Sequence, residues 1–279
     1  MRVDAHHHVW DLSVRDQDWI TGPGLRPLRR DFTVDDLRPE AAAAGIGRTV
    51  LVQTVTVAEE TPEFLALAEG SELIAGVVGW TDLTRPDVAD ELARLRELPG
   101  GHRLKGIRHQ VQGEPEPDWL LRPDVRRGLA AVAAAGLVYD LVVLPHQLPS
   151  CVRAAMDHPE LTFVLDHLGK PPIASGALAP WAARLRTLAA LPNTVGKLSG
   201  LVTEADLARW KADDLRPYAE TALAAFGPDR LMFGSDWPVC TLAASYAQVV
   251  AVTEKLTERL DEGERAEVFG GTALRVYGL

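Results

Sequence analysis

Three consecutive histidines, His6, His7 and His8, lie near the start of the chain in the segment VDAHHHVW. This segment has the alternating pattern of a β-strand, so His6 and His8 share one face and His7 points to the other. A purification tag is usually longer and flanked by linker residues, whereas this triplet is embedded between Val3 and Trp10. Two imidazoles on one face can bind a metal ion or donate hydrogen bonds. A single pair of this kind is by itself only weak evidence for a functional site.

Other residues capable of acid–base or electrophilic chemistry follow later apolar segments. They are Arg108 and His109, Tyr139 and Asp140, Asp166 and His167, and Asp236. Each has a structural alternative, because Asp236 could cap the next helix and Arg108 could form a salt bridge with Asp166. If all these residues lie at the same end of different strands, one shared functional site explains their positions together. The structural alternatives would need a separate explanation for each residue.

The apolar runs predict the strands that would position these residues. Eight runs have strand length and turn residues at their ends: 2–9, 49–55, 73–80, 104–111, 137–143, 161–168, 194–200 and 230–237. Segments of helical character lie between them, and two more helices are expected over 245–260 and 261–278. No GxGxxG follows a strand, so an α/β fold with a (β/α)8 TIM barrel is favoured over a Rossmann domain. With no linker in the chain, we expect a single domain over 1–279.

Composition excludes several functional classes. The chain has 29 Lys plus Arg against 39 Asp plus Glu, a net charge of -10 that disfavours nucleic acid as a partner. No apolar run reaches the roughly 18 residues of a membrane span, so no membrane partner is expected. The N-terminus lacks a secretory pattern, and Cys151 and Cys240 form no CxxC pair, which favours a cytoplasmic protein with reduced thiols. Monomer and homo-oligomer both remain open.

Several motifs together resemble a known family. VDAHHHVW, KGIRHQVQ, FVLDHLGKPPI, KLSGL and RLMFGSDWPV are similar to motifs of the amidohydrolase superfamily, in its amidohydrolase-2 branch of L-fuconolactonase-like and L-rhamnonolactonase-like sugar lactonases. The resemblance covers nearly the whole chain. It implies a distorted TIM barrel and a hydrolase of carbohydrate catabolism that opens a small-molecule sugar lactone to its aldonic acid by the attack of an Asp-activated water.

The resemblance also implies roles for individual residues. Asp236 would be the general base, with His167 and Arg108 as the other catalytic residues. Substrate would contact His109 and Tyr139, and the flat faces of Trp80 and Trp237 are further candidates for sugar binding.

The same resemblance bears on a metal. His6, His8 and Asp236 could hold a single Zn²⁺, because three N or O ligands plus water form an open catalytic site. The bridging lysine that binuclear members carry late on the fourth strand is missing from IRHQ, so two metals are not expected. A metal-independent lactonase, with arginine and histidine donors as the electrophile, is the equal alternative.

Two other functions compete with a sugar lactonase. One is a lactonase or decarboxylase acting on aromatic breakdown products such as pyrone or muconolactone carboxylates, for which Arg108, Arg26, Arg29 and Arg30 would supply extra cations. The other is a non-catalytic barrel that binds a sugar acid. The segment 11–30 is rich in Gly and Pro, and we expect an ordered loop that could cover the site.

Overall fold

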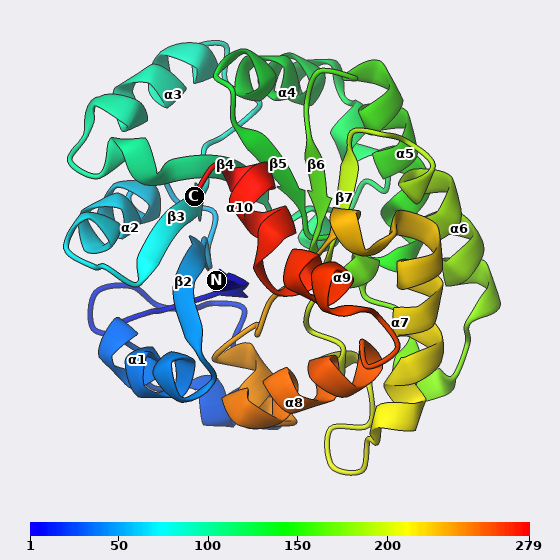
Figure 1. Cartoon of the computed structure of the whole chain (residues 1–279). Coiled ribbons are helices and arrows are strands. Elements are labelled where there is room, and N and C mark those ends of the chain that lie inside the picture. Colours follow the sequence, from blue (N-terminus) through cyan, green and yellow to red (C-terminus); the bar gives the residue numbers. More distant parts are fainter.

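Eight parallel strands form the centre of the protein and follow one another in chain order around the sheet (Figure 1). The computed structural model describes all residues from 1 to 279. The strands are β1 (Arg2–His7), β2 (Ile46–Val52), β3 (Ile74–Gly79), β4 (Leu104–His109), β5 (Val138–Leu141), β6 (Phe163–Leu165), β7 (Thr194–Leu198) and β8 (Leu231–Phe233). All eight predicted strands are present, and the predicted TIM barrel is confirmed.

A helix follows each strand and covers the outside of the barrel (Figure 1). These helices are α1 (Val34–Ala43), α2 (Glu60–Glu69), α3 (Val88–Glu97), α4 (Pro123–Ala134), α5 (Leu148–Asp157), α6 (Ala179–Ala189), α7 (Ala212–Phe226) and α8 (Tyr246–Leu256). The helix expected over 261–278 is interrupted: α9 (Glu262–Ala266) and α10 (Thr272–Tyr277) are separated by a π-helical turn over Glu267–Gly271. None of the helices combines the length and the apolar composition that crossing a membrane requires.

The interior of the barrel is filled by small branched side chains and closed at one end by α10. The inner cluster is made mainly of valines: Val50, Val52, Val78, Val138, Val164 and Val195, together with Met232. Ala273 and Tyr277 of α10 belong to the same cluster, and Figure 1 shows α10 across the middle of the ring of strands. Cys151 and Cys240 are buried and unpaired, as expected.

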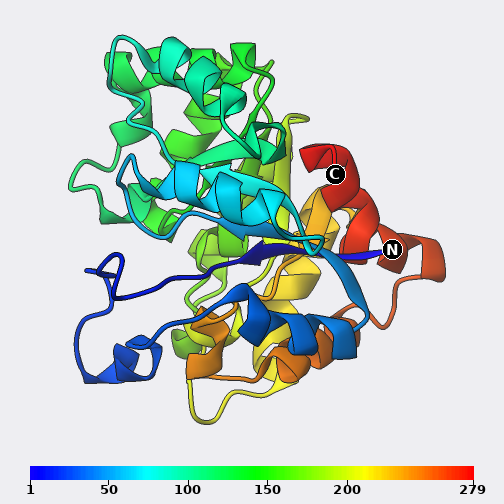
Figure 2. The same cartoon turned by 90° about the vertical axis from the view of Figure 1, so that its left-hand side faces the viewer.

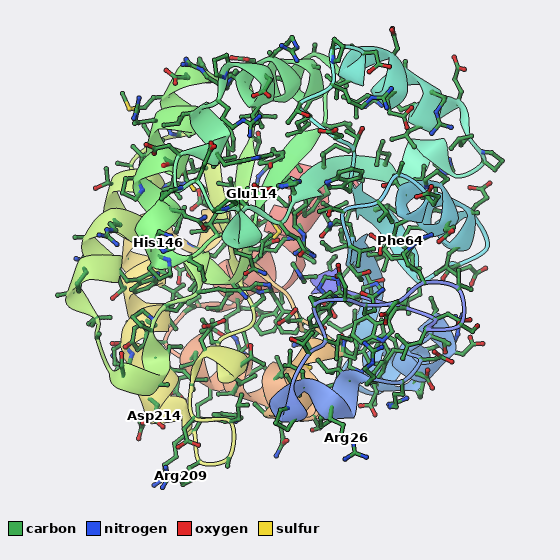
Figure 3. The ribbon with its side chains drawn as sticks, turned by 180° about the vertical axis from the view of Figure 1, so that it is seen from behind. Arg26, Phe64, Glu114, His146, Arg209 and Asp214 are labelled. Atoms are coloured by element: carbon green, nitrogen blue, oxygen red, sulfur yellow. The ribbon has the colours of Figure 1, made fainter.

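The opposite end of the barrel carries the loops that follow the strands. The connection from β1 to α1 projects at this end, away from both termini (Figure 2). It is an ordered loop, because Trp10 and Phe32 exchange two backbone hydrogen bonds at its base and a 3-10 helix spans Pro23–Leu28. Figure 3 views this end, with Glu114 of the β4–α4 connection near the middle and Arg209 at the rim.

The seam between β1 and the segment after β8 is joined by both backbone and side chains. The bridge between His7 and Trp237 carries two backbone hydrogen bonds, from His8 N–H to the carbonyl of Trp237 (2.7 Å) and from Asp236 N–H to the carbonyl of His6 (2.8 Å), and β1 and β8 form no continuous ladder. The buried carboxylate of Asp4 spans the gap: Oδ1 accepts from the backbone N–H groups of His6 (3.1 Å) and Ser235 (2.8 Å), and Oδ2 accepts from the hydroxyl of Tyr246 (3.0 Å). Asp4 therefore fixes the first strand against the last.

We predict that Asp4→Ala lowers the free energy of unfolding by about 3 kcal/mol, because it leaves three buried donors without an acceptor. Asp4→Asn is the matched control, since its amide oxygen still accepts from both backbone N–H groups. Urea denaturation of both variants measures the difference. Equal stability of the alanine variant and the wild type would contradict this role.

A second buried carboxylate holds the loop after β2. Glu60, the first residue of α2, accepts from the backbone N–H groups of Thr54 (2.8 Å) and Val55 (3.3 Å) and from the hydroxyl of Thr54. Burial raises the pKa of Glu60 from an ordinary 4.5 to about 7, against the opposing effect of these hydrogen bonds. The folded protein therefore binds this proton more tightly than the unfolded chain does.

This raised pKa predicts a pH-dependent stability. Between about pH 4.5 and pH 7 the folded state binds more protons at Glu60, so its contribution to the free energy of unfolding falls as the pH rises. Glu60→Gln keeps the acceptor and should reduce the decline between pH 5 and pH 8 by roughly 2–3 kcal/mol. Parallel urea titrations at the two pH values measure it, and an unchanged decline would contradict the prediction.

Candidate functional site

A layer of buried charges lies inside the barrel, next to the valines. Asp140, Asp166 and Lys197 each come two residues after a valine of the inner cluster, so their side chains point the same way. The ammonium of Lys197 lies 2.5 Å from Asp140 Oδ2 and 3.0 Å from Asp166 Oδ1. Arg108 Nη1 donates to Asp166 Oδ2 at 2.9 Å, which confirms the predicted salt bridge. Two cations and two anions balance within this layer.

Arg108 is held by more contacts than this one. Its Nε and Nη2 groups donate to Gln53 Oε1, and Nη2 also donates to the carbonyl oxygen of Gln53 at 2.5 Å. Four of its five N–H groups are therefore used within the protein. The remaining N–H, on Nη1, has His6 Nε2 at 3.4 Å as its partner in the structure. Arg108 can offer a substrate one hydrogen bond.

Three histidines and Asp236 converge beside this layer. His6 Nε2 and His8 Nε2 lie 3.1 Å apart. Asp236 Oδ1 lies 3.7 Å from His6 Nε2, 3.6 Å from His8 Nε2 and 3.8 Å from His167 Nε2. All four side chains are buried, and they come from the ends of β1, β6 and β8. The sequence-based expectation that these strand ends meet is confirmed.

Neighbouring groups fix how two of the rings are turned. His8 Nδ1 lies 2.8 Å from the carbonyl oxygen of Val52, which can only accept, so Nδ1 carries the proton and Nε2 presents a lone pair to the cluster. His167 Nδ1 lies 2.9 Å from the hydroxyl of Ser199. A Cβ at Gly200, where φ is 64°, would lie 2.6 Å from His167 Nδ1, so only glycine lets the backbone approach this ring.

The backbone is strained where the chemistry is placed. His167, Leu168 and Lys170 have φ near 52° in a tight turn after β6, and Asp236 has φ of 57°. Left-handed conformations are unfavourable for residues with a side chain and cost about 1–3 kcal/mol each, so they persist where the surroundings impose them. Both His167 and Asp236 are therefore held in positions that an unstrained strand end would not give them.

Burial sets the charges of the cluster. Burial lowers the pKa of His167 to about 4 and holds the pKa of His6 well below its ordinary value, although nearby carboxylates oppose both shifts. Burial alone would raise the pKa of Asp236, but its interactions with His167, His8 and His6 outweigh burial and hold it below the ordinary value. At neutral pH an ionised Asp236 faces neutral rings of His6 and His167.

These residues fit a single divalent cation. Two ligands about 2.1 Å from a tetrahedral zinc lie roughly 3.4 Å apart, and the spacings of 3.1–3.8 Å within the cluster are close to this. Ligand atoms of His6, His167 and Asp236 all lie within 4.8 Å of one another. The predicted set of His6, His8 and Asp236 is brought together, and His167 is a further candidate donor in a group with His6 and Asp236 that does not include His8.

The cluster opens into a cavity of about 130 Å³ at the loop end of the barrel. Its wall contains His8, Trp19, Thr54, Arg108, Gln110, Gln112, Val142, His167, Lys170, Asp236 and Val239. Most of these side chains are polar or charged. Gln112 Oε1 is buried and has no hydrogen-bond partner within the protein. Gln112 therefore brings to the wall an amide whose oxygen lacks a partner and is shielded from solvent.

The four residues expected to contact substrate, His109, Tyr139, Trp80 and Trp237, are not among the residues that line this cavity. Tyr139 alternates with Asp140 and faces outward, fully buried against Phe163. His109 alternates with Arg108; it stacks on Trp119 at 4.2 Å, and its Nε2 lies 2.7 Å from Glu114. These contacts occupy both rings away from the cavity wall.

The two tryptophans also serve the framework. Trp80 donates its indole N–H to His109 Nδ1 at 3.0 Å. Trp237 is buried and packs edge-on against Phe32, with ring centroids 5.5 Å apart. Trp19, from the loop after β1, is the tryptophan that lines the cavity.

Sequence reasoning missed Lys197, Gln112 and Lys170. A lysine in the apolar run TVGKLSG was a usable signal for Lys197, because a lysine inside a buried strand is rare unless it is paired. Gln112 and Lys170 follow their strands in loops, where no periodicity indicates the direction of a side chain. No sequence signal identifies those two.

Comparison with known proteins agrees with this architecture. The family model described as amidohydrolase matches residues 3–279. An L-fucono-1,5-lactonase from Burkholderia multivorans is 45% identical, with 100% of this chain and 96% of the relative covered. A second L-fucono-1,5-lactonase, from Burkholderia ambifaria, is 39% identical over 99% of this chain and 95% of its own.

A solved structure is equally similar. The crystal structure of an amidohydrolase from Burkholderia multivorans with bound zinc superposes with a TM-score of 0.94, at 44% identity and with 100% of this chain and 99% of that one covered. From the match along the chain, the barrel and the cluster at its mouth, we conclude that this protein belongs to the amidohydrolase family and is a hydrolase.

Proposed function

We propose that the protein is a sugar lactonase that opens L-fucono-1,5-lactone, or a close analogue, to the aldonic acid. The observation that carries this proposal is the convergence of Asp236 with His6, His8 and His167 at the wall of a polar cavity. Support comes from the two relatives named as L-fucono-1,5-lactonases, which match nearly the whole chain. Such a hydrolysis belongs to carbohydrate catabolism, after oxidation of the sugar to its lactone.

The proposed reaction needs a base, an electrophile and an acid. Asp236 accepts a proton from water as the water oxygen bonds to the lactone carbonyl carbon, which places a negative charge on the carbonyl oxygen. The bond from this carbon to the ring oxygen then breaks. Asp236 returns its proton to the departing alkoxide, so one carboxylate serves both steps.

The charge on the carbonyl oxygen needs donors. Arg108 lines the cavity and directs one N–H of Nη1 toward the cluster, 3.4 Å from His6 Nε2; its guanidinium is already fixed by Gln53 and Asp166, so little reorganisation is needed. A divalent cation held by His6, His8, His167 and Asp236 would supply Lewis-acid polarisation and a more acidic water when bound. Zinc is the candidate, since the similar amidohydrolase structure contains it.

Hydroxyl groups of a sugar suit the rest of the wall. Gln112 Oε1 lacks a donor, and a turn of this amide toward the cavity would let a sugar hydroxyl supply one. Trp19 offers a flat apolar face on the loop side, and Lys170 adds a cation within reach of the carboxylate that the reaction produces.

The aromatic-acid alternative has less support. Of the four arginines that would favour a dicarboxylate, Arg108 lines the cavity and Arg26, Arg29 and Arg30 do not: Arg29 pairs with Asp16 at 2.8 Å, and Arg30 lies over the ring of Phe32. The cations of the wall are Arg108 and Lys170. Arg26, Arg29 and Arg30 therefore give no support to a dicarboxylate, and the relatives named as L-fucono-1,5-lactonases favour the sugar lactone.

Asp236→Asn tests the proposed base. The amide cannot take the proton from water, so we expect kcat for L-fucono-1,5-lactone to fall by about 10²–10⁴. A pH-indicator assay of acid release measures turnover, with a pyrone dicarboxylate as the competing substrate. Asp206→Asn, on the surface beside Arg209, is the matched control and should keep wild-type turnover. Wild-type turnover in Asp236→Asn would exclude Asp236 as the base.

Gln112→Leu tests recognition of the sugar hydroxyls. It removes the free acceptor while keeping the size of the side chain, so we expect KM for the sugar lactone to rise about 3–10-fold with kcat little changed. Steady-state kinetics with L-fucono-1,5-lactone separate the two constants. A loss of kcat at constant KM would show that Gln112 acts on the reacting atoms instead.

A further inference from the structure

Each ring nitrogen of His6 faces one donor and one acceptor. On the inner side, Nδ1 lies 3.2 Å from the ammonium of Lys197 and 3.3 Å from Asp166 Oδ1. On the cavity side, Nε2 lies 3.1 Å from His8 Nε2 and 3.4 Å from Arg108 Nη1. A neutral imidazole carries one proton, so these contacts cannot all be satisfied at once.

The neighbours of His6 select one position for that proton. His8 Nε2 presents a lone pair, because His8 Nδ1 donates to the carbonyl of Val52. His6 Nε2 must then carry the proton to form the 3.1 Å hydrogen bond with His8. His6 Nδ1 is left as an acceptor, which matches the ammonium of Lys197 at 3.2 Å. The donors run in one direction, from Lys197 through His6 to His8 and Val52.

A metal ion needs the other arrangement. To bind a cation through Nε2, His6 must give up that proton and carry one on Nδ1, as ligating histidines commonly do toward a carboxylate. Asp166 Oδ1 is the acceptor at hand: it is buried, lies 3.3 Å from Nδ1, and also lies 3.0 Å from the ammonium of Lys197. The protein thus contains a partner for each of the two tautomers of His6.

We propose that Lys197 and Asp166 compete for Nδ1 of His6 and that Lys197 thereby lowers the affinity of the cluster for a divalent cation. Held by Lys197, His6 is a hydrogen-bond donor on the cavity side; held by Asp166, it is a metal ligand. Lys197 is a positioning residue, since it contacts neither the cavity wall nor Asp236. The inference rests on the metal ligands named in the proposed function.

The surroundings of Lys197 keep it in place. It is fully buried, and its main partner is Asp140, which in turn accepts from the hydroxyl of Tyr277 at 2.8 Å. The ammonium of Lys197 contacts both Asp140 and His6 Nδ1. The negative charge on Asp140 therefore decides how strongly Lys197 donates its hydrogen bond to the imidazole of His6. Changes at Asp140 and Lys197 should therefore move metal affinity in opposite directions.

Two variants make the test. Asp140→Asn removes the anion that competes for Lys197, so Lys197 holds His6 more firmly and zinc affinity should fall about tenfold. In Lys197→Met/Asp140→Asn the two opposite charges are removed together, which avoids leaving an unpaired buried charge. His6 Nδ1 then turns to Asp166, and zinc affinity should rise about tenfold over the wild type.

Competition with a chromogenic chelator measures the dissociation constant of Zn²⁺ for each variant, with thermal unfolding as the check on folding. Shifts in the same direction for both variants, or none in either, would overturn the proposal. The assay uses zinc alone, so its outcome is independent of whether the protein hydrolyses lactones.

A second readout covers the case in which the double variant does not fold. Nitrogen-15 NMR of the metal-free wild type reports which nitrogen of His6 carries the proton. We expect Nε2, with a shift to Nδ1 on addition of Zn²⁺. A proton on Nδ1 in the metal-free protein would overturn the proposal.

Discussion

The barrel depends on one carboxylate at its seam. The first and last strands form no continuous ladder: two backbone hydrogen bonds join the segments at their ends, and Asp4 adds a buried acceptor for the N–H of Ser235. A buried N–H without an acceptor is unfavourable, so this contact decides how β8 is placed beside β1. His6 follows Asp4 by two residues, and Asp236 directly follows Ser235. The contact between Asp4 and Ser235 therefore helps to set the position of His6 relative to Asp236. The distances between the side chains of the cluster therefore depend on how the barrel closes.

The charged layer is the second constraint. Burying an ion without its partner is strongly destabilising, whereas Lys197 and Arg108 are matched by Asp140 and Asp166. Apolar residues would fill this space at lower desolvation cost. The layer instead fixes both sides of His6 and leaves Arg108 with one unused N–H directed toward the cluster. Its charges are arranged to orient the groups of the site.

Much of the fold follows from the sequence, because eight apolar runs separated by helical segments leave few alternatives to a barrel. The meeting of His6, His8, His167 and Asp236 was equally predictable, since parallel strands bring their carboxyl ends to one edge. Side chains alternate along β5, so Asp140 shares a face with Val138 and Tyr139 points to the other face. This alternation could have shown from the sequence that Asp140 and Tyr139 do not face the same side. The cavity wall was not predictable: Gln112 and Lys170 are placed by loops, whose side-chain directions depend on contacts distant in the chain.

The contact between Asp4 and Ser235 joins residues 231 positions apart. During synthesis, β1 leaves the ribosome first and β8 among the last, so His6 and His8 remain without Asp236 until about five-sixths of the chain exists. Closing so long a loop is slow compared with forming local helices. An incomplete chain therefore has neither the base nor the full set of ligands, and the site is assembled only in the finished barrel.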